Sequence, residues 1–295
     1  MKSLIVCFLL SFIVTTISLE IDTYFINKNT DLRQTPLSPL EGPECLHTKM
    51  REIPLPPEVT VCYRRKPYQI RGFVTGHLSF GVMDSDWIDF HHGLIFGTWY
   101  SGAWLGYREK GKSFSWINMG GGFVKLHSWR HSCFRLNFES GRYAMFENGE
   151  KLFDDVYERL SEIRKRMNNS INLLTLGCWY VRFKPEEYSS YGEFTDLQMF
   201  GRSLTDDEML KITSCHQRIQ GDIISWEDED WILNGTSKSS RKETVDFKKD
   251  VCNGSKSNFH LVPFLQPGIS RGLTKTCEKL KGKVARYVET RVFFC

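Results

Sequence analysis

The sequence predicts an all-β protein in which two antiparallel sheets pack as a sandwich, with one or two short helices and an irregular C-terminal tail. Short segments rich in β-branched and aromatic residues recur about every eight to twelve residues between glycine-rich turns; they include 59–65, 93–99 and 103–109. Aromatic residues make up 14% of the chain and include 8 tryptophans, which favours a large β core. Almost no helical pattern separates these segments, so the strands are expected to pair as a sandwich.

The N-terminal segment 1–18 has the features of a secretory signal peptide. It contains Lys2, an apolar run and small residues before the expected cut. The run is shorter than the ~20 apolar residues that a membrane-spanning helix requires, and no later segment is apolar enough to span. The chain is therefore expected to be secreted and extracellular, without a membrane span.

The rest of the chain is expected to fall into three parts. Residues 19–44 combine scattered polar residues with three prolines, which predicts a poorly ordered leader. The sandwich is assigned to 45–252 and the C-terminal tail to 253–295.

The most regular pattern of the sandwich lies in 129–150 and predicts three strands in a meander. Apolar side chains at every second position predict a strand with one buried face and with Cys133 on its other face; they are Phe134, Leu136 and Phe138. Ser140-Gly141 and Asn148-Gly149 predict the two turns, because their residues tolerate positive φ.

Two short helices are expected. Residues 156–167 place apolar side chains at helical spacing, namely Val156, Leu160, Ile163 and Met167. Farther along, Thr205 begins a second helix whose first turn is acidic, which suits the positive end of the helix dipole. Glu208 follows Thr205 by three residues and completes a capping box.

Three segments resemble the pentraxin family. His131, Cys133 and Gly141 fit its His-x-Cys signature, although Leu136 stands where the family has tryptophan. A second segment follows the Leu176-Gly177 pair, where these residues fit the family pattern: Gly192, Glu193, Asp196, Phe200, Leu204 and Thr205. A third, with Cys215, 221–228 and 245–252, is similar to the C-terminal end of the neuronal pentraxins. The resemblance covers about 59–252 and implies a concanavalin A-like, laminin G-type jelly-roll sandwich.

The resemblance also implies disulfide pairs. Removal of the signal leaves eight of the 9 cysteines, an even number typical of a disulfide-bonded secreted chain. The family pattern pairs Cys62 with Cys133 and Cys215 with Cys252. Elimination leaves Cys45 with Cys178 and Cys277 with Cys295.

Pentraxins bind ligands through a paired calcium site, and most of its ligands are missing here. The run after Leu176-Gly177 is Cys-Trp-Tyr-Val, without a carboxylate, whereas calcium takes six or more oxygen ligands. The nearest acids, which we take as candidate metal ligands, are Asp89, Glu186 and Glu187. Calcium binding is therefore expected to be weak or absent, and no other cofactor is indicated.

Aromatic side chains cluster in the same loop and are candidate ligand-binding residues. They are Trp179, Tyr180, Tyr188 and Tyr191. Such rings stack on a sugar or another amphipathic ligand, although packing onto the sheet is the alternative role.

Glycosylation triplets, the net charge and the tail give further information about the partners of the chain. Asn168, Asn234 and Asn253 begin glycosylation triplets. The net charge of +4 is spread along the chain, which does not indicate a nucleic-acid partner. The tail contains a short run at 277–285 that resembles part of a C-type-lectin-like domain without its second half.

Taken together, these patterns favour a secreted, non-catalytic binding or adhesion module for an extracellular glycan, phospholipid head group or protein ligand, compatible with a homo-oligomeric assembly. The first alternative is a calcium-independent lectin. The second is a glycoside hydrolase on the same fold, which needs two carboxylates across a cleft. No catalytic residues are assigned: the acidic run 227–230, read as a strand, alternates between two faces, and Glu193 and Asp196 are likewise expected on opposite faces.

Overall fold

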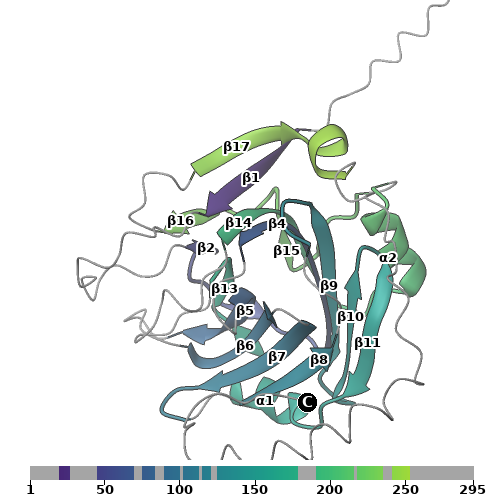
Figure 1. Ribbon diagram of the computed structural model, residues 1–295. Coiled ribbons are helices and arrows are strands. Elements are labelled where there is room, and N and C mark those ends of the chain that lie inside the picture. The colour runs from purple at the N-terminus through teal and green to yellow at the C-terminus, as the bar shows by residue number, and fades with distance from the viewer. Residues whose placement is uncertain are drawn as a thin grey trace, which may run out of the picture. The chain divides into compact units, whose positions relative to one another are not determined.

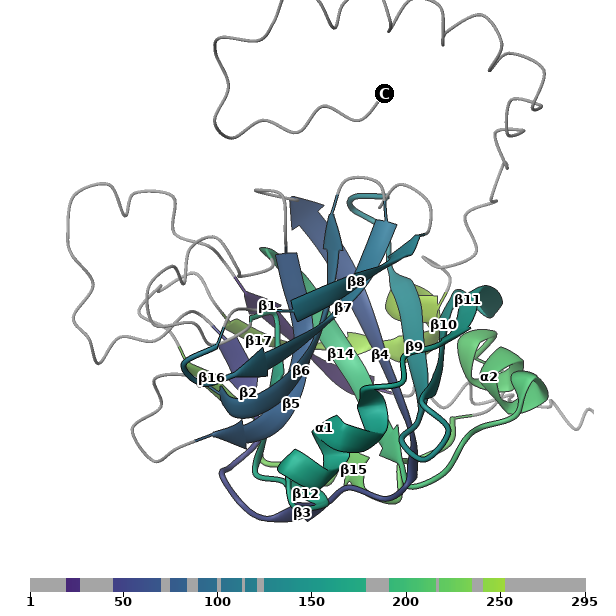
Figure 2. The same cartoon turned by 90° about the horizontal axis from the view of Figure 1, so that it is seen from below.

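The computed structural model describes residues 20–26, 45–69, 75–83, 90–99, 102–112, 115–120, 125–178, 191–215, 218–234 and 241–252. Within these ranges two antiparallel sheets pack face to face as a jelly-roll sandwich, which confirms the predicted fold class (Figures 1 and 2). The chain divides into two compact units, Met1–Lys256 and Ser257–Cys295. All described residues belong to the first unit, so the predicted tail lies outside them. No helix in the described ranges is long and apolar enough to cross a membrane.

The first sheet has the strand order β11-β10-β9-β4-β14-β1-β17, and β15 pairs with β14. Its strands are β1 (Glu20–Ile26), β4 (Glu58–Gln69), β9 (Arg130–Asn137), β10 (Arg142–Glu147), β11 (Glu150–Val156), β14 (Tyr191–Phe200), β15 (Ile224–Ser225) and β17 (Arg241–Asp246).

The second sheet has the order β16-β2-β13-β5-β6-β7-β8. Its strands are β2 (Cys45–His47), β5 (Thr75–Met83), β6 (Phe90–Trp99), β7 (Gly102–Glu109), β8 (Ser115–Gly120), β13 (Leu173–Leu176) and β16 (Ile232–Asn234). A short separate pair joins β3 (Ile53–Pro54) to β12 (Ser170–Ile171).

The core lies between the sheets and follows the two-residue period of the strands. From the first sheet it takes alternate residues of β4 and β9, and from the second sheet apolar residues of β5, β6 and β7. All are almost fully buried; examples are Val59, Val61, Phe134, Leu136, Leu78, Phe80, Phe96 and Leu105.

The predicted meander is present as β9, β10 and β11. Phe134, Leu136 and Phe138 are buried in the main core, whereas Cys133 lies in a second apolar cluster on the opposite face. Asn148 and Gly149 join β10 to β11 with φ values of 51° and 83°, the positive range that a primed two-residue turn requires.

Strand β1 corrects the expectation of a poorly ordered leader for residues 20–26, while the remainder of the predicted leader, residues 19 and 27–44, lies outside the described residues. Residues 20–26 pair with both β14 and β17, and Ile21, Tyr24 and Ile26 are buried in the core. The prolines that suggested disorder all follow this segment. Because two neighbouring strands satisfy its backbone and the core covers one face, seven residues suffice for a stable strand.

The two predicted helices are present, one of them shorter than its pattern. Helix α1 spans Leu160–Arg166, whereas Val156 ends β11 and is 54% exposed. Helix α2 spans Asp206–Thr213 with the predicted capping box between Thr205 and Glu208. After β17 the chain forms a π-helix, η2 (Phe247–Cys252).

Among the described residues, six cysteines form three disulfides. Cys62 pairs with Cys133 and Cys215 with Cys252, as the family resemblance implies, and Cys45 pairs with Cys178. Cys62 and Cys133 lie directly opposite each other on β4 and β9, with Cα atoms 4.1 Å apart. Cys277 and Cys295 lie outside the described residues.

Replacing Thr205 by alanine is expected to destabilise the protein by about 1 kcal/mol. The Thr205 hydroxyl accepts a hydrogen bond from the Glu208 backbone N–H at 3.2 Å, and alanine leaves that donor without its cap. Urea unfolding of Thr205→Ala measures the loss, and Thr205→Ser is the control because it retains the hydroxyl. Equal loss of stability in both variants would contradict the capping role.

Candidate functional site

Most of the side chains that the sequence predicts as ligand-binding lie outside the described residues. They are Asp89, Glu186, Glu187, Trp179, Tyr180 and Tyr188. Tyr191 begins β14, but only its backbone is described. These assignments stay predictions. Of the three glycosylation acceptors, Asn168 is exposed just after α1, the side chain of Asn234 is not described, and Asn253 lies outside the described residues.

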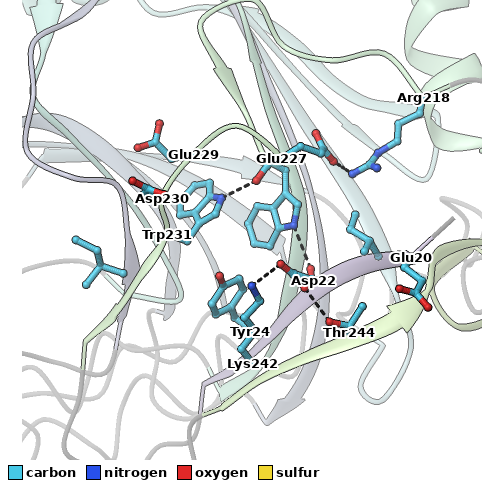
Figure 3. Close-up of a pocket in the computed structure, with 13 residues that line it drawn as sticks. Glu20, Asp22, Tyr24, Arg218, Glu227, Glu229, Asp230, Trp231, Lys242 and Thr244 are labelled. Carbon is cyan, nitrogen blue, oxygen red and sulfur yellow. Dashed lines mark hydrogen bonds and ion pairs between the residues drawn. The ribbon is translucent and has the colours of Figure 1, made fainter.

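The described residues form a pocket of about 590 Å³ beside β1 and β17 (Figure 3). Its walls come from β1, from β17 and from the segment that leads from α2 to β16. The lining residues are Glu20, Ile21, Asp22, Tyr24, Arg218, Trp226, Glu227, Glu229, Asp230, Trp231, Ile232, Lys242 and Thr244.

A turn between β15 and β16 supplies much of this lining. The sequence pattern places the acidic run 227–230 on a strand, and this is wrong, because the chain leaves the sheet after Ser225. The Ser225 carbonyl accepts hydrogen bonds from the backbone N–H groups of Asp228 and Glu229, both at 3.2 Å. The turn therefore brings Glu227 and Glu229 to the same pocket.

Three aromatic rings form the apolar part of the pocket. The Tyr24 and Trp226 rings meet edge to face with centroids 5.6 Å apart, and those of Trp226 and Trp231 are 4.8 Å apart. The Trp226 Nε1–H donates to the Asp22 carbonyl, and the Trp231 Nε1–H donates to the Trp226 carbonyl, both at 3.1 Å. Both indole N–H groups are used within the fold, so the rings are held in place. Tyr24 and Trp226 are buried, and the partly exposed Trp231 is the ring most accessible to a ligand.

On the β1 side the pocket carries a charged group that joins β1 to β17. Asp22 forms an ion pair with Lys242 at 2.6 Å and accepts a hydrogen bond from the Thr244 hydroxyl at 2.9 Å (Figure 3). The hydrogen bond that the Lys242 ammonium donates to Asp22 raises the pKa of Lys242, while burial raises the pKa of Tyr24. Lysine and tyrosine therefore both remain protonated at neutral pH.

Opposite β1, Glu227 is held by three partners. It accepts hydrogen bonds from Gln198 Nε2 at 3.2 Å and from the Ser225 hydroxyl at 2.9 Å, and it forms an ion pair with Arg218. Arg218 also lies 3.4 Å from a carboxylate oxygen of Asp196. This side of the pocket is thus continuous with a buried charge network.

The network depends on a bulge in β14. The pairing register between β14 and β4 shifts between Thr195 and Gln198, and Asp196 has a φ of 54°. The expectation that Glu193 and Asp196 lie on opposite faces is therefore wrong: Glu193 pairs with Lys66 and Asp196 with Arg64, which are alternate residues of β4. An extra residue in one strand changes the face that the next side chain reaches.

Arg64 joins this bulge to two other elements. Its side chain is fully buried, with Nε 3.1 Å from Asp196. It donates from Nη2 to the Ile212 carbonyl in α2 at 2.8 Å and lies 5.3 Å from the centre of the Phe247 ring in η2. Arg64 therefore links the bulge of β14 to α2 and η2.

Carboxylates outnumber cations in the lining, five to two. The five are Glu20, Asp22, Glu227, Glu229 and Asp230, against Arg218 and Lys242. Cations just outside pair with two of them: Lys49 with Asp230 at 2.7 Å and Arg51 with Glu229 at 2.6 Å. The Lys49 hydrogen bond lowers the pKa of Asp230, so this carboxylate stays ionised and accepts hydrogen bonds.

One group of potential metal ligands occurs among the described residues, formed by Cys62, His131 and Cys133. Both sulfurs are used in the disulfide, so neither is available as a thiolate. His131 Nδ1 lies 2.7 Å from the Thr213 hydroxyl, and burial holds the pKa of His131 well below its usual value. The group is a structural part of the sandwich.

The pocket residues were not among the predicted ligand-binding set, although the sequence holds one signal for them. Trp226 and Trp231 enclose the acidic run 227–230, and ligand pockets typically combine aromatic side chains with a few polar groups. Asp22 and Tyr24 gave no signal, because they are remote in sequence from the turn that they face.

Comparison with known proteins supports the fold. No family model matches the sequence, and no curated protein matches it. Among solved structures, the chain is similar to a heptameric SAP-like pentraxin from Limulus polyphemus, with a TM-score of 0.53 and 19% identity over 76% of this chain and 94% of that chain. This likeness shows the jelly-roll sandwich shared with pentraxins.

Two weaker likenesses have TM-scores below 0.5. The CBM40 of the Ruminococcus gnavus IT-sialidase, bound to α2,3 sialyllactose, gives 0.42 at 16% identity, over 59% of this chain and 96% of that chain. The extracellular region of zebrafish Gpr126/Adgrg6 gives 0.48 at 12% identity, over 76% of this chain and 26% of that chain.

Proposed function

We propose that the chain is an extracellular, non-catalytic binding module of pentraxin type that recognises a glycan at the pocket between β1, β17 and the 226–231 turn. The observation that carries the proposal is the combination of an aromatic group, with Trp231 partly exposed, and a surplus of carboxylates in one pocket. Sugars present apolar C–H faces that pack on aromatic rings, and their hydroxyl groups donate to carboxylates. The lining offers both kinds of contact side by side.

The extracellular part of the proposal is supported by the three disulfides, because such bonds persist in oxidising compartments. The expected signal peptide also supports secretion to the extracellular space.

The non-catalytic part is supported by the state of the carboxylates. A glycosidase needs one carboxylic acid with a raised pKa to protonate the leaving group. Among the described residues, each carboxyl group whose pKa departs from its usual value is displaced downward; these are Glu109, Asp154, Glu162, Asp206, Glu208 and Asp230. Glu227, at the centre of the pocket, is already bound by Arg218, Gln198 and Ser225.

A binding screen of the purified protein tests this proposal. Immobilised glycans and phospholipid vesicles are presented with calcium and with a chelator. We expect binding to glycans that is unchanged by the chelator, because four of the five carboxylates in the pocket already pair with cations of the chain. Binding that disappears with the chelator would instead favour the predicted residues Asp89, Glu186 and Glu187, and binding to vesicles alone would favour a lipid ligand.

Replacing Trp231 by alanine is expected to weaken glycan binding at least about tenfold, which is about 1.4 kcal/mol, because one wall of the pocket loses its ring. Calorimetry with a glycan from the screen measures the change. Trp231→Phe retains an aromatic face and is expected to bind within about threefold of the natural protein. Leu210→Ala, an exposed residue on α2, is the remote control. Equal affinity of the Trp231→Ala variant would move the site elsewhere.

A further inference from the structure

A polar cluster lies inside the sandwich, at one end of the core. It consists of Tyr63, Arg65, His77, Thr98, Arg130 and Glu147, each at most 6% exposed. They come from β4, β9 and β10 of one sheet and from β5 and β6 of the other, which face each other across the interior (Figure 2). We call this set the interior polar cluster.

The strand period explains how two arginines enter the core. On β4, the residues two apart are Val59, Val61, Tyr63 and Arg65, and the first three belong to the main core. Arg65 follows them in register and faces the interior. Its direct neighbour on β9 is Arg130, so two cations sit opposite each other on one face, an arrangement that is unfavourable unless compensated.

The cluster contains only one carboxylate, Glu147, to balance the charges of these two arginines. Arg130 forms an ion pair with Glu147. Arg65 donates from Nη1 to the Thr98 hydroxyl at 3.4 Å, a weak contact, and within the part of the chain that the structure describes its Nε and Nη2 have no hydrogen-bond partner. Among the described residues, Glu147 pairs with Arg130, and no carboxylate pairs with Arg65.

The neighbouring side chains do not change this balance. Tyr63 is hydrogen-bonded to His77 Nδ1, and burial raises the pKa of Tyr63, so the phenol stays neutral. Burial, with a further contribution from the Arg65 charge, holds the pKa of His77 well below its usual value, so the imidazole is neutral too. A buried charge without a partner is among the most costly features of a protein interior.

We infer that the interior polar cluster binds one small anion, held by Nε and Nη2 of Arg65. The guanidinium fork presents these two N–H groups side by side, which suits an oxyanion or a carboxylate in two-point contact and also a halide. Because the surrounding side chains are almost fully buried, the occupant is a small free anion and not part of a glycan or a lipid. The site is separate from the pocket proposed above, which lies at β1 and β17.

Thermal unfolding in different sodium salts at constant ionic strength tests the inference. Chloride, bromide, acetate and phosphate are compared with gluconate, which is too large for the cluster. For a bound anion, Tm is expected to rise by about 3 to 5 °C for each tenfold increase in its concentration above the Kd. The anion that gives the largest rise identifies the class: halide, carboxylate or phosphate.

Arg65→Met is expected to lose this dependence, because it removes the positive charge and both donors. The control is Lys66→Met, which removes a partly exposed cation from the opposite face of β4 and is expected to keep it. Where Arg65→Met does not fold, bromide soaked into crystals of the natural protein decides: an anomalous peak beside Arg65 is expected. Equal Tm in chloride, acetate, phosphate and gluconate, or crystals without that peak and with a carboxylate of the chain on Arg65, would overturn the inference.

Discussion

Replacing Asp196 by asparagine is expected to destabilise the folded protein by about 3 to 5 kcal/mol, the usual cost of breaking a buried ion pair. Arg64 is fully buried and 3.1 Å from Asp196, and Arg218 lies 3.4 Å from the same carboxylate. Asparagine keeps the volume and tolerates the positive φ of this bulge position, so the variant removes mainly the negative charge. The buried Arg64 guanidinium then loses its carboxylate partner, and the partly exposed Arg218 keeps only Glu227.

Urea unfolding of Asp196→Asn measures this cost. Glu193→Gln is the matched control, since Glu193 lies on the same strand and pairs with Lys66 at 3.4 Å, with both side chains partly exposed. Such a pair contributes about 1 kcal/mol or less. A similar loss in the two variants would show that the bulge network does not stabilise the sandwich more than a surface pair.

Removing the Cys62–Cys133 disulfide as the double alanine variant is expected to cost about 2 to 5 kcal/mol. The bond closes a loop between residues separated by 71 positions, and without it the unfolded chain gains conformational freedom. Both side chains are buried beside Phe146 and Met209, so the smaller alanines also leave apolar contacts unfilled.

Chemical unfolding under non-reducing conditions measures the loss of stability in the double alanine variant. Peptide mapping without reduction provides an independent check: it is expected to recover Cys62 joined to Cys133. Any other partner for Cys62 would contradict the pairing of β4 with β9 in the observed register. Unchanged stability of the double variant would show that the two strands hold together through packing alone.

The regular parts of the fold were predictable because their signals are local. The period of two in 130–138, the Asn148-Gly149 turn and the capping box from Thr205 to Glu208 each depend on residues within a few positions of one another. The structure has all three.

The pocket could not be predicted, because it depends on distant parts of the chain. Strand β1 is stabilised by β14 and β17, and nothing in its own seven residues reveals those neighbours. The bulge at Asp196 changes the face of a carboxylate without a glycine or proline to mark it. The turn after Ser225 lies in the acidic run 227–230, whose sequence is equally compatible with a strand. A strand would place these acids on two faces, whereas the turn brings Glu227, Glu229 and Asp230 to one pocket.

The position of β1 sets the order in which the molecule can be completed during synthesis. The Thr195 hydroxyl donates a hydrogen bond to the Asp22 carbonyl, 173 positions away in sequence. The Thr23 hydroxyl donates one to the Glu243 carbonyl, 220 positions away. Strand β1 precedes the other described strands along the chain, so it can pair only after the ribosome has delivered β14 and β17. Contacts of such long range fold slowly. Until then its apolar side chains and backbone hydrogen-bonding groups lack their native partners. Asp22 and Tyr24 of this strand line the pocket. The proposed glycan binding therefore requires that β1 has already paired with β14 and β17.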